Sequence, residues 1–141
     1  NDNKWNLLIA GKIKPEYLNE LKNINNSNKI EYLGYTDSKS FYEKIDVLIV
    51  PSLWNEPFGR VVLEAIINNK TVITSKRGGI AEIMQNNQKF TFNTDKKSLS
   101  NLIDDIITNR ENLSFNYSLE NMAKFNIKNT VLKYSTIFSE L

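Results

Sequence analysis

The segment Pro51-Ser-Leu-Trp-Asn-Glu-Pro-Phe-Gly-Arg-Val-Val-Leu-Glu64 decides the fold, because a change from strand to helix falls inside it. The apolar run Val47-Leu-Ile-Val50 precedes the segment, and Ala65-Ile-Ile67 continues it. This order predicts a buried strand, a loop and then a helix. Proline is favoured in the first turn of a helix, where its missing N–H would be unpaired anyway. We therefore expect the helix to start between Pro57 and Gly59.

The start of this helix is a predicted anion site. The first amides of a helix have no acceptor within the helix, and they lie at the positive end of its dipole. Gly59 leaves room for a close approach, and Arg60 adds a full positive charge; both favour a bound phosphate. The amides expected to face that phosphate belong to Phe58, Gly59, Arg60 and Val61.

Two carboxylates flank the predicted anion site. Glu56 lies in the loop just before the helix, within reach of a group next to a bound phosphate. Glu64 has apolar neighbours on both sides in the sequence, so we expect it to be buried, and a buried charge needs a partner or a ligand. The paired hydroxyls of a ribose or a hexose suit a carboxylate, which only accepts hydrogen bonds. Two alternatives stay open: Glu56 as a solvated loop carboxylate, and Glu64 as a structural one satisfied by backbone amides, Arg60 or Lys70.

Strands alternate with helices along the rest of the chain. Strands are expected at 5–10, 29–33, 47–50, 71–75 and 89–92, and helices after Pro15, at 80–84, and in a short segment capped by Ser38. Helices are also expected after Ser98 and from Ile127, both packed on the surface through an apolar face. Residues 113–125 are expected to form a short helix or a helix and loop. This pattern predicts the α/β class: a three-layer αβα sandwich with a mainly parallel, Rossmann-like sheet and C-terminal helices.

Four loops are expected to meet at one edge of this sheet. In open α/β sheets, ligands bind at the carboxyl ends of the strands, where loops meet helix starts. If all the strands are parallel, these ends lie together. The loops concerned are 11–12, 34–35, 52–59 and 75–79.

The segment Glu56-Pro-Phe-Gly-Arg-Val-Val-Leu-Glu64 resembles the E-x7-E signature of the retaining glycosyltransferases of family 4, also called group 1. Pro51-Ser52 before the signature, and Thr71-Val-Ile-Thr-Ser75 and Gly78-Gly-Ile-Ala-Glu82 after it, extend the resemblance. Proteins of this family pair two Rossmann-like domains in the GT-B arrangement. The resemblance implies that residues 1–141 are a single C-terminal domain that binds the nucleotide sugar, without the N-terminal acceptor domain. Because the chain has no initiator Met, we expect a fragment of a longer protein.

The resemblance also implies roles for individual residues. Glu56 is implied to be catalytic, contacting hydroxyls of the donor hexose near the reacting carbon, and Glu64 to bind the ribose. The amides of 58–61 would hold the diphosphate, with Arg60 as a clamp. A plain turn remains the alternative for the other implied residues, which frame the base or let the backbone pass close to the site: Gly34, Tyr35, Gly78 and Gly79.

The implied reaction is the transfer of a hexose from a nucleotide sugar, such as a UDP-hexose or GDP-mannose, to a glycan or glycolipid acceptor. Bacterial surface polysaccharide or lipopolysaccharide synthesis is the implied setting. No cofactor or metal is implied, because helix dipoles and basic side chains would stabilise the departing nucleoside diphosphate. The acceptor would bind through the missing domain, the full-length protein could contact a membrane peripherally, and this domain alone should bind donor weakly and transfer nothing. The alternative is a non-catalytic nucleotide-binding module of the same fold.

Composition excludes several other classes of function. The length of 141 residues and a charged content of 24% fit one ordinary globular domain. The net charge of +2 comes from scattered residues, so no nucleic-acid surface is predicted. The chain has neither Cys nor His, which argues against a disulfide framework and the usual zinc sites. Without a spanning segment or a signal peptide, we expect a cytoplasmic location, which includes the inner face of the plasma membrane. Asp104 and Asp105 are expected to face water rather than a metal.

Overall fold

The computed structural model describes residues 5–25, 27–109, 115, 117, 122, 123 and 125–140. Strands and helices alternate along the chain, as the sequence predicts, and this confirms the α/β class. The first half contains β1 (Leu7–Ala10), α1 (Pro15–Ile24), β2 (Ile30–Gly34), α2 (Ser38–Lys44), β3 (Val47–Val50) and α3 (Arg60–Ile67). The second half contains β4 (Thr71–Ser75), α4 (Gly79–Ile83), a 3-10 turn (Gln88–Phe90), β5 (Thr91–Phe92), α5 (Lys96–Thr108) and α7 (Ile127–Ser139).

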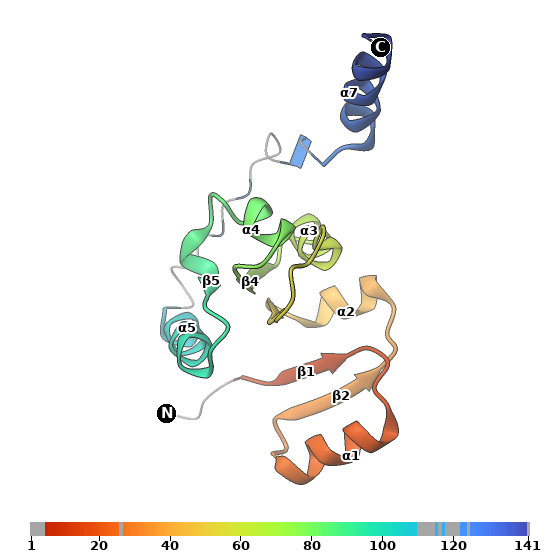
Figure 1. Ribbon diagram of the computed structural model, residues 1–141. Helices are drawn as coiled ribbons and strands as arrows, with labels where there is room; N and C mark the ends of the chain where they lie inside the picture. Colours follow the sequence, from red (N-terminus) through yellow and green to blue (C-terminus); the bar gives the residue numbers. More distant parts are fainter. Residues whose placement is uncertain are drawn as a thin grey trace.

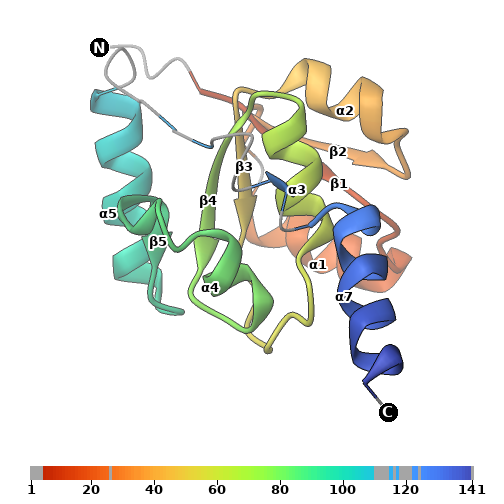
Figure 2. The same ribbon diagram turned by 90° about the horizontal axis from the view of Figure 1, so that it is seen from above.

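All the recorded strand pairs are parallel, but they form two ladders rather than one. β1 pairs with β2 (Figure 1), and β4 lies between β3 and β5 (Figure 2). In the second ladder Val47 lies opposite Thr71 and Val50 opposite Thr74, so β3 and β4 end at the same edge. Over the ranges that the structure describes, no ladder joins β1 to β3.

The core lies around β4. Val72 and Ile73 of this strand are almost completely buried, as are Val62 and Ala65 of α3 and Ile80 of α4. α3 and α5 lie on opposite sides of β4 (Figure 2), which gives this part of the chain the helix–sheet–helix layering expected of the fold. The unit formed by β1, α1 and β2 contributes no residue to the described core, and α1 has no buried residue.

Three local expectations need correction. The cap of α2 is Asp37, not Ser38, because its carboxylate accepts a hydrogen bond from the Ser40 amide at 3.0 Å. That bond lowers the pKa of Asp37. Helix α3 has Gly59 as its N-cap and begins at Arg60, slightly later than predicted. The last strand is only two residues long, because a 3-10 turn occupies the residues before it.

The two C-terminal helices differ in their packing. α5 packs Leu99, Leu102 and Ile103 against the core and buries Ile106, as expected. α7 is helical as predicted, but it buries none of its residues, so the expectation that it packs through its apolar face is wrong. Asp104 and Asp105 are exposed, as expected. Most of 113–125 lies outside the described residues. None of the helices traced in the described ranges combines the length and apolarity that crossing a bilayer requires.

Candidate functional site

The start of α3 presents unpaired backbone donors. Gly59 adopts a left-handed conformation with φ 74° and ψ 47°. The Val62 amide donates to the Gly59 carbonyl at 3.0 Å, so intrahelical bonding begins only there. The amides of residues 58–61 find no acceptor in the described part of the chain. These are the four amides that the sequence pattern selects, although the helix starts later than expected.

A second loop locks this helix start in place. The Gly79 amide donates to the Glu56 carbonyl at 2.7 Å. A Cβ at Gly79 would lie 2.5 Å from the Pro57 carbonyl oxygen, and one at Gly78 would collide with the backbone of Glu56. The two glycines therefore allow the turn before α4 to lie directly against the loop before α3. The sequence predicts that these glycines let the backbone pass close to the ligand site. The structure shows which atoms they approach: the backbone of the loop before α3.

Glu56 is held by its neighbour Trp54. The indole Nε1–H donates to Glu56 Oε2 at 3.0 Å, while the tryptophan ring remains largely exposed. This bond holds one carboxylate oxygen, while the other has no hydrogen-bond partner among the described residues. Sequence reasoning missed the contact of Trp54 with Glu56, because side-chain orientation is not visible in a pattern of residue types.

Glu64 is not buried as predicted, since 34% of its side chain is exposed. Helix α3 buries Val62 and Ala65 but exposes Val61 and Ile67, so it has a solvent-facing side despite its apolar composition. Glu64 lies between these two environments. The apolar residues next to Glu64 in the sequence do not reveal this boundary between the buried and the exposed side of α3.

The partners of Glu64 come from two helices. Arg60 Nη2 lies 3.5 Å from Glu64 Oε1, one helical turn away, and this bears out one of the structural partners considered for this carboxylate. The second partner was missed: the Tyr42 hydroxyl of α2 donates towards Glu64 Oε2 at 3.3 Å and towards the Val61 carbonyl at 3.1 Å. Burial of the phenol, together with the charge of Glu64, raises the pKa of Tyr42 to about 12.

The remaining candidate residues lie in the first ladder. The Gly11 amide donates to the Gly34 carbonyl at 2.7 Å, which brings the loops after β1 and β2 together. Tyr35 is exposed, and a Cβ at Gly34 would meet nothing within 4 Å. No hydrogen bond between described residues joins these two loops to those at 55–59 and 75–79. Among the described residues, hydrogen bonds thus tie the four loops into two pairs, the loops after β1 and β2 and the loops before α3 and α4.

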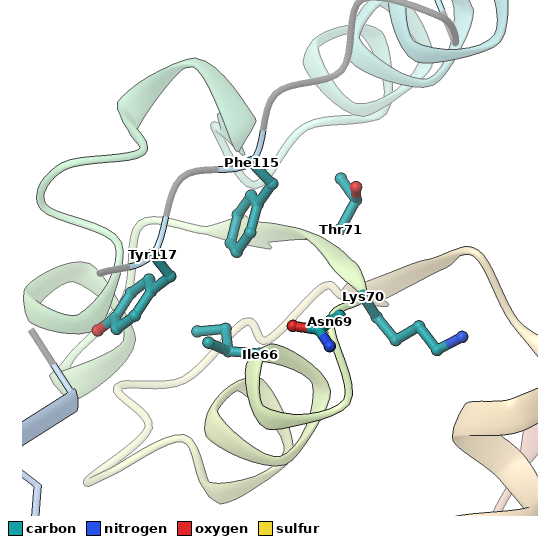
Figure 3. A pocket seen from close by; sticks show the side chains of 6 residues that line it. All are labelled: Ile66, Asn69, Lys70, Thr71, Phe115 and Tyr117. Carbon is teal, nitrogen blue, oxygen red and sulfur yellow. The ribbon is translucent and has the colours of Figure 1, made fainter. Parts of the chain in front are cut away.

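A cavity of about 190 Å³ lies away from this site, where α3 ends and β4 begins (Figure 3). Its lining consists of Ile66, Asn69, Lys70, Thr71, Phe115 and Tyr117. This is the opposite end of α3 from its unpaired amides. Among the residues with described positions, no group of three or more His, Cys, Asp or Glu side chains could hold a metal ion.

Known proteins resemble this chain over part of their length. The model of the family described as "Glycosyl transferases group 1" matches residues 1–127. Over 63 residues the chain is 44% identical to an uncharacterized 42.6 kDa protein in the cps region of Klebsiella pneumoniae, and this match covers 45% of this chain and 17% of that protein.

A second relative is the lipopolysaccharide 1,2-N-acetylglucosaminetransferase of Salmonella typhimurium, 44% identical over 45 residues, which are 32% of this chain and 12% of that protein. Among solved structures, Anabaena Alr3699/HepE in complex with UDP-glucose has the same fold, with a TM-score of 0.79 at 21% identity. That match covers 96% of this chain and 41% of the Anabaena chain. The chain thus corresponds to well under half the length of each of these proteins.

Proposed function

The chain belongs to the glycosyl transferases of group 1, and from this premise we propose that it is the donor-binding, C-terminal domain of a retaining GT-B hexosyltransferase. The observation that carries the proposal is the start of α3, where the amides of 58–61, which have no acceptor among the described residues, lie between Glu56 and Glu64 in the sequence. Unpaired amides at the positive end of a helix dipole suit the diphosphate of a nucleotide sugar. A carboxylate on either side suits the hydroxyls of its two sugars.

The proposed catalytic effect is electrostatic. Negative charge develops on the nucleoside diphosphate as it departs, and donors already aimed at that position stabilise the transition state. The bond from Gly79 to the Glu56 carbonyl supports such preorganisation, because it ties the loop before α3 to a second loop. Arg60 is well placed to add a positive charge, since 82% of its side chain is exposed and it can turn from Glu64 towards a phosphate. We propose that no metal ion or other cofactor takes part.

In this proposal Glu56 is the catalytic residue. Trp54 holds one of its carboxylate oxygens, which leaves the other to accept from hydroxyls of the donor hexose near the reacting carbon. Gly34 and Tyr35 would frame the base through their backbone, although a tight turn alone accounts for their geometry.

The relatives guide the choice of substrates. The Anabaena structures hold UDP, UDP with glucose, or UDP-glucose, which favours a UDP-hexose donor here over GDP-mannose. The names of the Klebsiella and Salmonella proteins favour a glycan or glycolipid acceptor of a surface polysaccharide or lipopolysaccharide. We propose that a separate N-terminal domain binds this acceptor, at the cytoplasmic face of the membrane.

A binding panel tests the proposal. This chain is titrated with UDP-glucose, GDP-mannose and ADP-glucose, and binding is followed by ligand-observed NMR. We expect weak binding of one sugar nucleotide and no transfer of labelled hexose by this chain alone. Glu56→Gln should weaken binding of the sugar nucleotide more than binding of the bare nucleoside diphosphate, whereas Glu16→Gln on α1 should change neither. Binding that Glu56→Ala leaves unchanged would instead support the non-catalytic nucleotide-binding module, and absence of binding to the whole panel would contradict the proposal.

A further inference from the structure

Tyr42 connects α2 to the acidic side chain of α3. The whole residue is only 3% exposed, and its ring packs edge-on against Phe41 at 5.6 Å between centroids. Its hydroxyl reaches residues 19 and 22 positions later in the chain, at the Val61 carbonyl and at the Glu64 carboxylate. Burial leaves the ring few alternative positions, so the hydroxyl is a fixed point.

The tyrosine offers a single proton to two acceptors. A phenol has one O–H donor, which here is shared between a neutral carbonyl at 3.1 Å and a charged carboxylate at 3.3 Å. Hydrogen bonds to charged acceptors are the stronger kind, so the carboxylate competes well despite its longer distance. This proton stays on the phenol at neutral pH, because the ordinary pKa of tyrosine is about 10 and burial with the charge of Glu64 raises that of Tyr42 further.

The other partner of Glu64 holds it less firmly. Arg60 is a solvent-exposed side chain, and its ion pair with Glu64 is an i,i+4 surface pair at 3.5 Å. Such pairs contribute little and exchange readily with water. If Arg60 turned towards a bound phosphate, Tyr42 would remain as the contact that fixes the carboxylate.

The number of free acceptor positions on Glu64 matches a particular ligand group. An ionised carboxylate offers about four lone-pair positions. Tyr42 uses one on Oε2, and the exposed Arg60 lies 3.5 Å from Oε1, so at least two remain for donors from outside the protein whether or not Arg60 turns away. Two neighbouring hydroxyls on one sugar ring supply two donors at matching separation.

We propose that Tyr42 is a positioning residue, which fixes the Glu64 carboxylate so that its remaining lone pairs accept from the paired ribose hydroxyls of a nucleoside diphosphate. The inference rests on the proposed function, because it takes Glu64 to be the ribose ligand. It adds a residue of α2 to a site otherwise built from α3 and the loops beside it. The competing explanation is that Tyr42 is a core residue whose hydroxyl is satisfied by Val61 alone.

The test compares two ligands in the same protein. UDP carries the paired hydroxyls, whereas 2′,3′-dideoxy-UDP lacks them, and the ratio of the two dissociation constants reports the ribose contacts. Both ligands are measured on the same sample of each variant, so the fraction of folded protein is the same for both. The ratio of the two dissociation constants therefore stays valid for a partly destabilised variant. Tyr42→Phe keeps the ring, and Tyr17→Phe on the exposed face of α1 serves as the matched control.

We expect the wild-type chain to prefer UDP by about tenfold or more, as hydrogen bonds to a charged group predict. Glu64→Gln should largely remove this preference, and Tyr42→Phe should reduce it several-fold. Tyr42→Phe should have little further effect in the Glu64→Gln background, since coupled residues are not additive. Tyr17→Phe should leave the preference unchanged.

Two results would overturn the inference. One of them leaves the proposed function intact, and the other also contradicts part of it. If Glu64→Gln abolishes the preference for UDP and Tyr42→Phe leaves it intact, Tyr42 is only a core residue and the proposed function stands. If Glu64→Gln itself leaves the preference intact, Glu64 is not the ribose ligand, and this part of the proposed function fails together with the inference.

Discussion

Replacing Gly78 by alanine tests whether the turn before α4 holds the loop that carries Glu56. Gly78 has a φ of 54°, a conformation that side-chain-bearing residues rarely adopt. A Cβ there would collide with the Glu56 carbonyl oxygen, and it would lie 2.8 Å from the Glu56 nitrogen and 2.9 Å from the Asn55 carbonyl carbon. All three are backbone atoms, so no side chain can rotate away to make room.

The expected loss of stability has two parts. Holding alanine at this positive φ costs about 1–3 kcal/mol. Forcing the Glu56 backbone aside costs about another 1–3 kcal/mol, as inserted methyl groups do elsewhere. The whole of about 2–6 kcal/mol is a large share of the roughly 5–15 kcal/mol that holds a typical domain folded. Gly34→Ala is the matched control: its φ is 66°, but its Cβ would meet nothing within 4 Å, so only a conformational cost of about 1–2 kcal/mol applies.

Urea unfolding of the two variants and the wild type measures both costs. We expect Gly78→Ala to lower the midpoint clearly more than Gly34→Ala, and to shift the amide resonances of Glu56 and Phe58 in the folded protein. Equal losses in the two variants would refute the packing of this turn on the Glu56 loop, and with it the preorganisation proposed for the helix start.

Three further predictions follow from buried and unpacked groups. Thr74 Oγ1 is buried without a partner among the described residues, so Thr74→Val should stabilise the chain by about 1 kcal/mol in urea unfolding; a loss of stability would show that the hydroxyl is bonded. The amides of β1 and β2 should exchange with solvent at least about tenfold faster than those of β4 in hydrogen-exchange NMR, because this unit adds nothing to the described core; equal protection would contradict this. The phenol of Tyr42 has a raised pKa of about 12, so the stability that its proton contributes is complete below about pH 10 and is lost as pH rises to about 12. The difference in unfolding free energy between wild type and Tyr42→Phe should therefore shrink across that window, and a constant difference would contradict the raised pKa that burial and the charge of Glu64 produce.

The local features of the site could be predicted because their signals are local. Proline and glycine in 57–59 indicate a helix start, and the α3 cap at Gly59 confirms its position to within a residue or two. The Gly78-Gly79 pair marks a tight turn, and the structure supplies the neighbour that makes both glycines necessary. The alternation of strands and helices predicts the α/β class from hydrophobic periodicity alone.

The features that were missed depend on tertiary contacts. The bond between Tyr42 and Glu64 joins residues 22 positions apart on two helices, and no spacing rule reaches that far. The exposure of Glu64 was mispredicted because apolar neighbours in a sequence need not surround a side chain in space. The apolar pattern of α7 predicts a helix, but it does not supply a surface for that helix to pack against.

The most direct measurement is an amide chemical-shift titration of the chain with UDP. We predict saturable shifts at the amides of Gly59, Arg60 and Val61, which shrink in Glu64→Gln while the fold is retained. If these amides stay unperturbed at saturating UDP, or if the shifts gather instead around Ile66 and Asn69 at the distant cavity, the start of α3 is not the diphosphate site.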